Sequence, residues 1–212
     1  MKLPLFPLQT VLFPQGQLPL QIFEVRYLNM VRRCERERSP FVVATLVEGQ
    51  EVQSTPPSPE GGGRSERFEA LGTLATLDMV SHAQPGLLRV ACRGGSRVRI
   101  RHSEKGPLGL WLGEVDVLDD DRPIPIPSEL LYISDTLHQV HVQLRRDHPE
   151  WQDSGAPLDP QAPVWQDAGW VANRWAEMLP LDLASRYRLL SQDSPLLRLE
   201  LIGDELDRLG MT

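Results

Sequence analysis

The sequence predicts an α+β protein with a β domain first and a helical bundle after it. Short apolar runs separated by glycine and proline turns fill residues 1–118, as in antiparallel barrels and sandwiches. An acidic, proline-rich stretch occupies residues 119–127 and is predicted to be a linker. Across residues 128–212, apolar residues recur at every third or fourth position, which is the period of amphipathic helices.

The first 38 residues are predicted to form two strands and a helix. Residues 3–8 and 18–23 are short apolar runs, and the turn between them holds Pro14 and Gly16. Prolines within both runs lack a backbone donor, so we expect irregular or edge strands and not central ones. Tyr27, Val31 and Cys34 then follow at helical spacing, with charged residues between them.

Further strands are expected where β-branched and apolar residues are frequent, at 41–47, 68–80, 86–92, 96–102 and 108–118. Glycine predicts turns between the last four of these runs, at 84–86, 93–95 and 105–107. Residues 53–65 contain several prolines and three consecutive glycines. No helix pattern follows them, so they are predicted to be a surface loop and not a phosphate site.

Three to four helices are predicted in the second half of the chain. Their apolar stripes run over residues 130–144, 164–178, 183–190 and 199–209. Side chains that can accept a hydrogen bond from the first helical turn predict the N-caps Ser128, Asp182 and Ser194. Pro180 is expected to stop the second stripe, and Gly210 is expected to end the last helix.

Several motifs in the chain carry a resemblance to a known family. The first three are Leu-Pro-Leu-Phe-Pro-Leu at 3–8, Val-Leu-Phe-Pro-Gln-Gly at 11–16 and Leu-Pro-Leu-Gln-Ile-Phe-Glu-Val-Arg-Tyr at 18–27. Together with residues 68–77, 88–100 and 178–191, they resemble the N-terminal domain of Lon proteases and the stand-alone bacterial proteins made of that domain. The resemblance implies a PUA-like antiparallel β pseudo-barrel with one helix, followed by a helical bundle.

The resemblance also implies a non-enzymatic module that recognises protein. The ATPase part of a Lon protease needs a Gly-x-x-x-x-Gly-Lys-Ser/Thr string to hold phosphate and magnesium, and the sequence has none. No catalytic residue and no cofactor are therefore expected. His138 and His141 are three positions apart on a predicted helix, but we expect solvent-facing histidines there and not a metal site.

Composition narrows the partners and the compartment. The formal net charge is −7 and the pI is near 5.3. This acidic charge argues against a protein whose main role is to coat nucleic acid, because nucleic acid is also negatively charged. Cys34 and Cys92 form no Cys-x-x-Cys pair, which favours a reducing cytoplasm. Prolines and glutamines interrupt the apolar N-terminus, and no run approaches the roughly 20 residues that cross a bilayer, so we expect neither export nor membrane insertion.

The expected ligand is an unfolded protein, a peptide or a partner protein, bound on apolar surface near the junction of the two domains. Glu24, Arg26 and Tyr27 of the opening motif are candidates because they follow its apolar residues. Trp151 and Trp170 are candidates because they lie off the apolar stripe, where tryptophan can form an exposed patch or cover a seam between domains. The oligomeric state stays open.

An alternative is an RNA-binding PUA-like protein. Strand alternation places Arg97, Arg99 and Arg101 on one face, where phosphate groups could be bound. Glu114 and Asp116 on a neighbouring strand are expected to neutralise that face, and no aromatic residues are interleaved for base stacking. Nucleic acid is therefore the second choice. A small-molecule sensor is a third interpretation to which the sequence assigns no residue.

Overall fold

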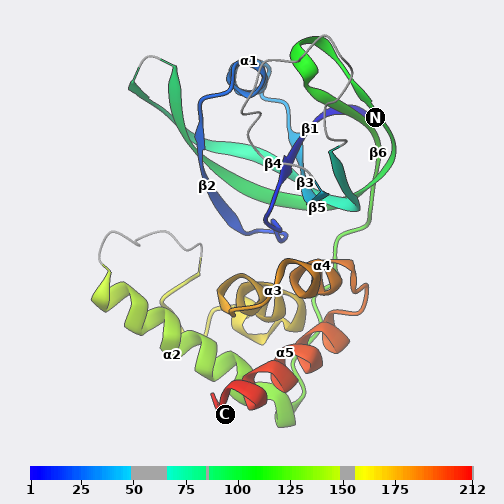
Figure 1. Ribbon diagram of the computed structural model, residues 1–212. Coiled ribbons are helices and arrows are strands. Elements are labelled where there is room, and N and C mark those ends of the chain that lie inside the picture. Colours follow the sequence, from blue (N-terminus) through cyan, green and yellow to red (C-terminus); the bar gives the residue numbers. More distant parts are fainter. Residues whose placement is uncertain (49–65, 85, 149–155, 212) are drawn as a thin grey trace. The chain divides into compact units, whose positions relative to one another are not determined.

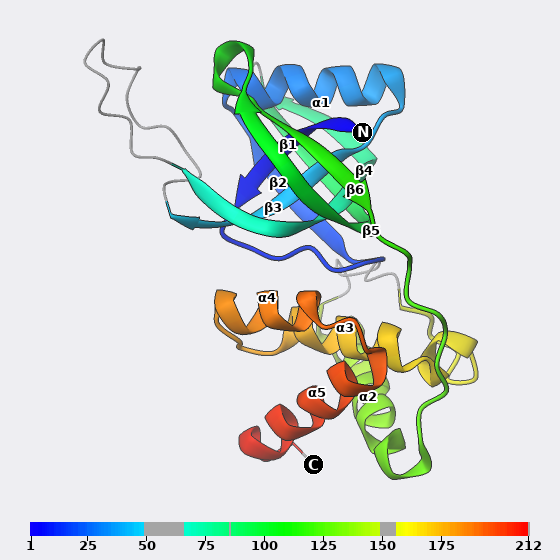
Figure 2. The ribbon, with the colours of Figure 1, turned by 90° about the vertical axis from the view of Figure 1, so that its right-hand side faces the viewer.

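A computed structural model of the chain describes residues 1–48, 66–84, 86–148 and 156–211 (Figure 1). The predicted glycine-rich loop at 53–65 lies outside these residues. The chain divides into two compact units, Met1–Asp119 and Asp120–Thr212. The first holds strands and one long helix, and the second holds helices, so the predicted α+β class is confirmed (Figure 2).

In the part of the chain that the structure describes, the first unit has six β-strands and one α-helix. The strands are β1 Lys2–Leu8, β2 Gln17–Ile22, β3 Phe41–Glu48, β4 Arg67–Gln84, β5 Leu87–Lys105 and β6 Trp111–Val117. The helix is α1 Val25–Glu37, and η1 Pro107–Gly109 is a 3₁₀ turn between β5 and β6. The strand order is β2-β5-β4-β3-β1-β6, and an additional pairing of β5 with β6 closes the sheet into a barrel. Because β1 and β3 pair in parallel, the sheet is mixed where the sequence predicts only antiparallel strands.

Strand β1 lies between two neighbours, although its prolines predict an irregular or edge position. Lys2–Leu5 pairs with β6, and Leu5–Leu8 pairs with β3. Pro4 lies in the first half and Pro7 in the second. Each proline therefore has a strand partner on one side only, which leaves its missing donor outside the ladder. Strand β2 pairs with β5 alone and is an edge strand, as predicted.

Strand β5 is continuous, and the turn predicted at 93–95 is wrong. Its first part pairs with β2, its last part pairs with β6, and Gly94 lies where one partner gives way to the other. The N–H of Gly94 donates to the carbonyl of Gly16, and the N–H of Gln15 donates to the carbonyl of Gly94, both at 2.8 Å. A Cβ on Gly94 would lie 2.2 Å from the carbonyl oxygen of Phe13. This glycine is needed for close approach of two backbones and not for a turn.

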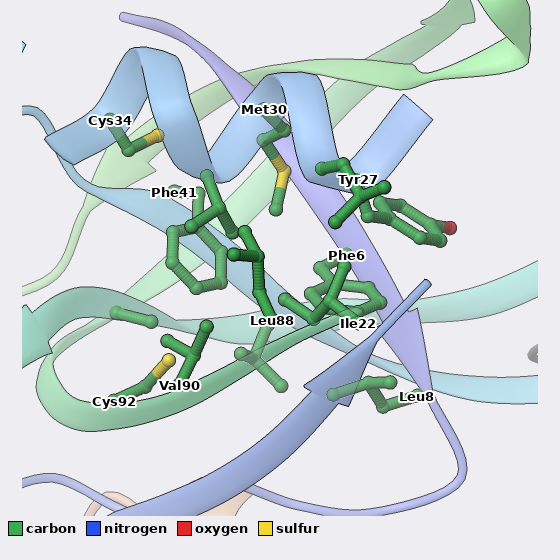
Figure 3. Close-up of a cluster of buried hydrophobic side chains, with 14 of the residues drawn as sticks. Phe6, Leu8, Ile22, Tyr27, Met30, Cys34, Phe41, Leu88, Val90 and Cys92 are labelled. Atoms are coloured by element: carbon green, nitrogen blue, oxygen red, sulfur yellow. The ribbon is translucent and has the colours of Figure 1, made fainter. Parts of the chain in front are cut away.

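Helix α1 covers one opening of the barrel and supplies part of its core (Figures 2 and 3). Tyr27, Met30 and Cys34 point from α1 toward the strands, and all three are buried. The predicted helical stripe of this segment is therefore confirmed. Cys34 and Cys92 are both free and buried in the same cluster, and burial raises the pKa of the Cys92 thiol to about 12.

The second unit consists of four α-helices and two 3₁₀ turns in the described residues. They are η2 Ser128–Leu130, α2 Leu131–Asp147, η3 Pro163–Gln166, α3 Ala168–Met178, α4 Leu183–Ser191 and α5 Pro195–Leu209. Helix α3 contacts the other three helices. Asp182 accepts a hydrogen bond from the N–H of Ser185, and Ser194 accepts one from the N–H of Leu197, as the predicted caps require. Ser128 is not a helix cap, because it begins the 3₁₀ turn η2 and donates to Glu129.

The stretch predicted as a linker, residues 119–127, is tied into the second unit. Arg198 of α5 is 1% exposed and donates through Nη1 to Asp121 Oδ2 at 2.8 Å and to Asn173 Oδ1 at 2.9 Å. Its Nη2 donates to the carbonyl of Gln192 at 2.6 Å. One buried guanidinium thus holds this stretch, α3 and the start of α5 together.

Candidate functional site

A buried polar network joins the start of α1 to the turn η1. Glu24 is the N-cap residue of α1, and its carboxylate accepts a hydrogen bond from Arg26 Nε at 3.1 Å. Arg26 Nη1 donates to the carbonyl of Gly109 at 3.2 Å and lies 3.7 Å from Glu66 Oε1. The side chain of Arg26 is 3% exposed and that of Glu66 is 8% exposed. A buried cation is stable here because two carboxylates and a carbonyl surround it.

Aromatic rings complete this network. Trp111 Nε1 donates to the carboxylate of Glu66, and the Trp111 ring makes an edge contact with Phe68 at 5.4 Å between ring centroids. Arg26 Cζ lies 4.5 Å from the centroid of the Tyr27 ring, which stacks on Phe6 at 4.1 Å. The network therefore fixes the positions of α1, η1 and the start of β4 relative to one another.

Glu24, Arg26 and Tyr27, the binding candidates of the opening motif, all belong to this network, but the expectation that they reach a surface is wrong for two of them. Arg26 is 4% exposed and Tyr27 is 2% exposed, because both take part in the buried network. Glu24 is half-buried. Their role is to position the segments that carry other side chains.

Those segments carry three exposed apolar side chains, which we call the apolar ridge. Phe23 is 53% exposed, Val25 is 62% exposed and Leu108 is 66% exposed. Phe23 and Val25 flank the α1 N-cap, and Leu108 lies in η1, which contacts α1 (Figure 2). Large side chains this exposed contribute little to folding and can bury apolar area on a ligand.

The backbone of Leu108 is strained. Its φ is 59° and its ψ is 15°, a left-handed conformation that glycine and asparagine adopt more easily. It occupies the third position of a turn in which the N–H of Gly109 donates to the carbonyl of Gly106 at 3.1 Å. A leucine here costs roughly 1 kcal/mol in backbone conformation and is exposed as well. Strain of this kind occurs often at functional sites.

Sequence reasoning missed the ridge. The sequence patterns singled out none of Phe23, Val25 and Leu108 as binding residues. One signal was present for Leu108, because an apolar residue follows Gly106-Pro107 in a turn where glycine or asparagine is usual.

The tryptophan candidates do not form an exposed patch in the described residues. Trp151 lies outside them. Trp170 is 5% exposed, and its ring makes an edge contact with Trp165 at 5.0 Å and lies 5.7 Å from the Arg174 guanidinium. Of the two alternatives for Trp170, the exposed patch is therefore wrong, since the ring packs within an aromatic cluster of the second unit.

The three arginines of the RNA alternative do not share one exposed face. Arg97 is 6% exposed, and the N–H of Leu118 donates to its carbonyl, so the chain leaving β6 runs alongside it. Arg101 Nε lies 2.6 Å from Asp116 Oδ2, which is the predicted cross-strand neutralisation. Arg99 is exposed. A face with one buried and one neutralised arginine is a poor match to a row of phosphates.

The two helix histidines differ from the expectation that both face solvent. His138 is half-buried against Trp165, whereas His141 is 5% exposed, with its ring 5.9 Å from that of Trp165. Burial, with Arg145 and Arg174 nearby, lowers the pKa of His141 to about 4. Across the described ranges, no three His, Cys, Asp or Glu side chains are grouped so that they could hold a metal ion.

We expect the second unit to lose up to about 3 kcal/mol of its free energy of unfolding between pH 7 and pH 4 through His141. His141 binds a proton with a pKa of 6.5 in the unfolded chain and of about 4 in the folded chain. Below pH 6.5 the proton therefore favours the unfolded chain, so the free energy of unfolding is highest above pH 6.5 and falls as the pH is lowered toward 4. Urea unfolding followed by tryptophan fluorescence at several pH values measures it. His141→Leu should flatten the pH dependence, and His138→Leu should keep it. A His141→Leu profile as steep as the original would contradict the assignment.

No helix in the described part of the chain is both long and apolar enough to span a bilayer.

The fold and the ridge together define a class of protein. It is an α+β chain with a closed barrel, and its exposed apolar side chains lie on segments that the buried, ion-paired Arg26 network holds in place. The chain belongs to the family of the ATP-dependent protease La (LON) substrate-binding domain, whose model matches residues 2–208. The predicted resemblance is thereby confirmed. None of the curated proteins compared with the chain is a match.

Solved structures agree with this family. The crystal structure of the Lon N-terminal domain protein from Xanthomonas campestris is 29% identical, covers 95% of this chain and 96% of that chain, and has a TM-score of 0.72. The N-terminal domain of the Mycobacterium avium complex Lon protease is 16% identical, with coverage of 96% and 97% and a TM-score of 0.57. At that identity, the second structure supports the fold alone.

Proposed function

We propose that the chain is a non-enzymatic recognition module that binds unfolded segments of protein through the apolar ridge. The observation that carries the proposal is Leu108, an exposed leucine in a strained backbone conformation beside exposed Phe23 and Val25. The family supports it, because the matched model describes a substrate-binding domain. The two free, buried cysteines are in keeping with a reducing cytoplasm as its location.

Charge supports an apolar ligand for the ridge. The charges beneath it are engaged with one another, since Arg26 interacts with Glu24 and Glu66. Lys105 Nζ lies 5.1 Å from the centroid of the Trp111 ring. With its neighbours neutralised, the ridge gains from burying apolar area and gains little from binding a charged group. We therefore expect weak, largely salt-insensitive binding of uncharged apolar segments.

Replacing Leu108 by glycine should weaken binding without harming the fold. Glycine adopts the left-handed conformation without strain, so the free energy of unfolding should stay the same or rise by up to about 1 kcal/mol. Loss of the leucine contact should raise the Kd for a labelled, uncharged peptide rich in leucine and phenylalanine by about fivefold to tenfold. Fluorescence anisotropy measures the Kd, and urea unfolding measures the stability.

Leu158→Ser is the matched control, because Leu158 is 60% exposed and lies in the second unit, away from the ridge in sequence. It should leave the Kd unchanged. Equal peptide affinity for the original chain and the Leu108→Gly variant would exclude the ridge as the binding surface.

A further inference from the structure

The arginines near the end of α1 fall into two groups that differ in their partners. Arg33 and Arg36 are paired with Glu37, at 3.6 and 3.0 Å. Arg32 and the C-cap residue Arg38 are exposed, and neither makes an ion pair within residues 1–48, 66–84, 86–148 and 156–211. Two cationic groups of this helix can therefore bind a ligand without breaking an existing ion pair.

Each of these arginines lines one of two cavities between α1 and β4, which together we call the α1–β4 groove. Near the start of the helix it holds a cavity of about 390 Å³, lined among others by Leu28, Arg32, His82 and Leu87. Near the end of the helix it holds a cavity of about 410 Å³, lined among others by Glu35, Arg38 and residues 76–80. The first cavity is lined by α1 residues 28 and 32, and the second is lined by residues 34, 35 and 38 at the end of the helix. The two cavities therefore lie one after the other along α1.

The groove is lined by both apolar and polar residues, and its arginines outnumber the acidic side chain that is not paired with Arg93. Met79 is 58% exposed, and Val80 packs partly on the core beneath it. Of the two acidic residues among those lining the cavities, Asp78 is paired with Arg93 at 2.8 Å. The other is Glu35, which lies between the two arginines in the sequence. A complementary ligand therefore has negative charge near each arginine and an apolar group between them.

The backbone at Arg38 adds a second observation. Its φ is 49° and its ψ is 39°, the left-handed conformation that ends α1. The backbone N–H of Arg38 donates to the carbonyl of Glu35 at 3.4 Å, and that of Ser39 donates to the carbonyl of Cys34 at 3.1 Å. Glycine is favoured at such a helix end because it has no Cβ. Arginine there is less stable than glycine, and its exposed guanidinium lines the groove.

We propose that the α1–β4 groove binds an extended peptide segment with two acidic residues four positions apart and an apolar residue midway between them. One carboxylate lies on Arg32, a second on Arg38, and the apolar side chain between them covers Met79 and Val80. Six positions separate the two arginines by about 9 Å along the helix axis and by about 120° around it, so the distance that a ligand must span is longer than the axial rise. Residues four apart in an extended segment are separated by about 13 Å and share one face with the residue midway between them, so all three side chains can face the groove. The inference rests on the proposed function, since it names the class of segment that such a module selects.

The test compares two labelled peptides with the 212-residue chain. The first has two glutamates four positions apart with leucine midway between them, and the second has glutamines in place of the glutamates. Fluorescence anisotropy should give about tenfold tighter binding of the acidic peptide at low salt, with the difference shrinking as salt is added. Equal binding of the two peptides would overturn the proposal.

Variants of the arginines separate binding from folding. Arg32→Gln should weaken binding of the acidic peptide by about threefold to fivefold. Arg38→Gly should weaken it similarly while Tm stays the same or rises by about 2 °C, because the left-handed strain is relieved. Arg33→Gln and Arg36→Gln are matched controls on the same helix and should leave affinity unchanged, since those arginines are already paired. Losses of equal size in the controls would show an effect of net charge alone.

Two further outcomes distinguish this inference from its alternatives. If a short single-stranded RNA displaces the acidic peptide and the apolar residues of the peptide make no difference, the groove is a polyanion site and the peptide assignment is wrong. If the uncharged apolar peptide binds but the acidic peptide does not bind more tightly than its glutamine form, the groove proposal fails and the proposed function stands. If neither peptide binds, both fail.

Discussion

Replacing Gly94 by alanine is expected to lower the free energy of unfolding of the first unit by about 3 kcal/mol or more. A Cβ at this position would lie 2.2 Å from the carbonyl oxygen of Phe13 and 3.1 Å from its carbonyl carbon. Both atoms belong to the backbone, so no side-chain rotation relieves the overlap. The segment must move away, which breaks two hydrogen bonds that Gly94 makes to Gln15 and Gly16.

Gly95→Ala is the control for this prediction. A Cβ there would meet Leu74 Cβ at 3.5 Å, an ordinary contact, and alanine in a strand costs less conformational entropy than glycine. Its stability should therefore be unchanged or slightly higher. Urea unfolding, with hydrogen exchange of peptides from β5 and residues 11–16 as the local readout, measures both variants. Similar stabilities for the two would mean that the close approach is not needed.

Replacing Arg198 by leucine is expected to destabilise the second unit by roughly 3 kcal/mol. The variant would leave the carboxylate of Asp121 and the oxygens of Asn173 and Gln192 without the guanidinium that binds them. The side chain of Asp121 is 18% exposed, so water recovers part of the loss. Residues 119–127 should also loosen, because Arg198 holds them, and endoproteinase Asp-N should cleave before Asp119, Asp120 and Asp121 more quickly.

Arg208→Leu is the matched control, on the same helix. Arg208 pairs with Glu205 at 2.9 Å, but its side chain is 71% exposed, so its loss should change stability by less than about 0.5 kcal/mol. Four of the five tryptophans lie in the second unit, so fluorescence reports its unfolding. Unchanged Asp-N cleavage before residues 119–121 in Arg198→Leu would show that the guanidinium does not hold this stretch.

The elements that could be predicted are those whose signal lies in neighbouring residues. Helix α1 followed from the spacing of Tyr27, Val31 and Cys34, and α5 followed from Ser194 and Gly210 at its ends. Strand β3 followed from a continuous apolar run. These patterns are local because a helix turn spans about four residues and a strand alternates every two.

The burial of the candidate residues could not be predicted. The sequence singled out Glu24, Arg26 and Tyr27, but Arg26 and Tyr27 are buried, while the neighbouring Phe23 and Val25 are exposed. Whether a charged side chain is buried depends on partners distant in sequence. Arg26 reaches the carbonyl of Gly109, 83 positions away, and no local pattern contains that contact.

The sequence by itself determined the α+β class, the order of strands before helices, most helix ends and the family resemblance, because each depends on periodicity, capping or motif. Only the tertiary structure decided that β1 pairs in parallel with β3, that Gly94 permits a backbone approach and does not turn the chain, and that Arg26 and Arg198 are buried. These features arise from contacts between distant segments. Barrel closure and helix packing set them, and both depend on the three-dimensional arrangement of the whole unit.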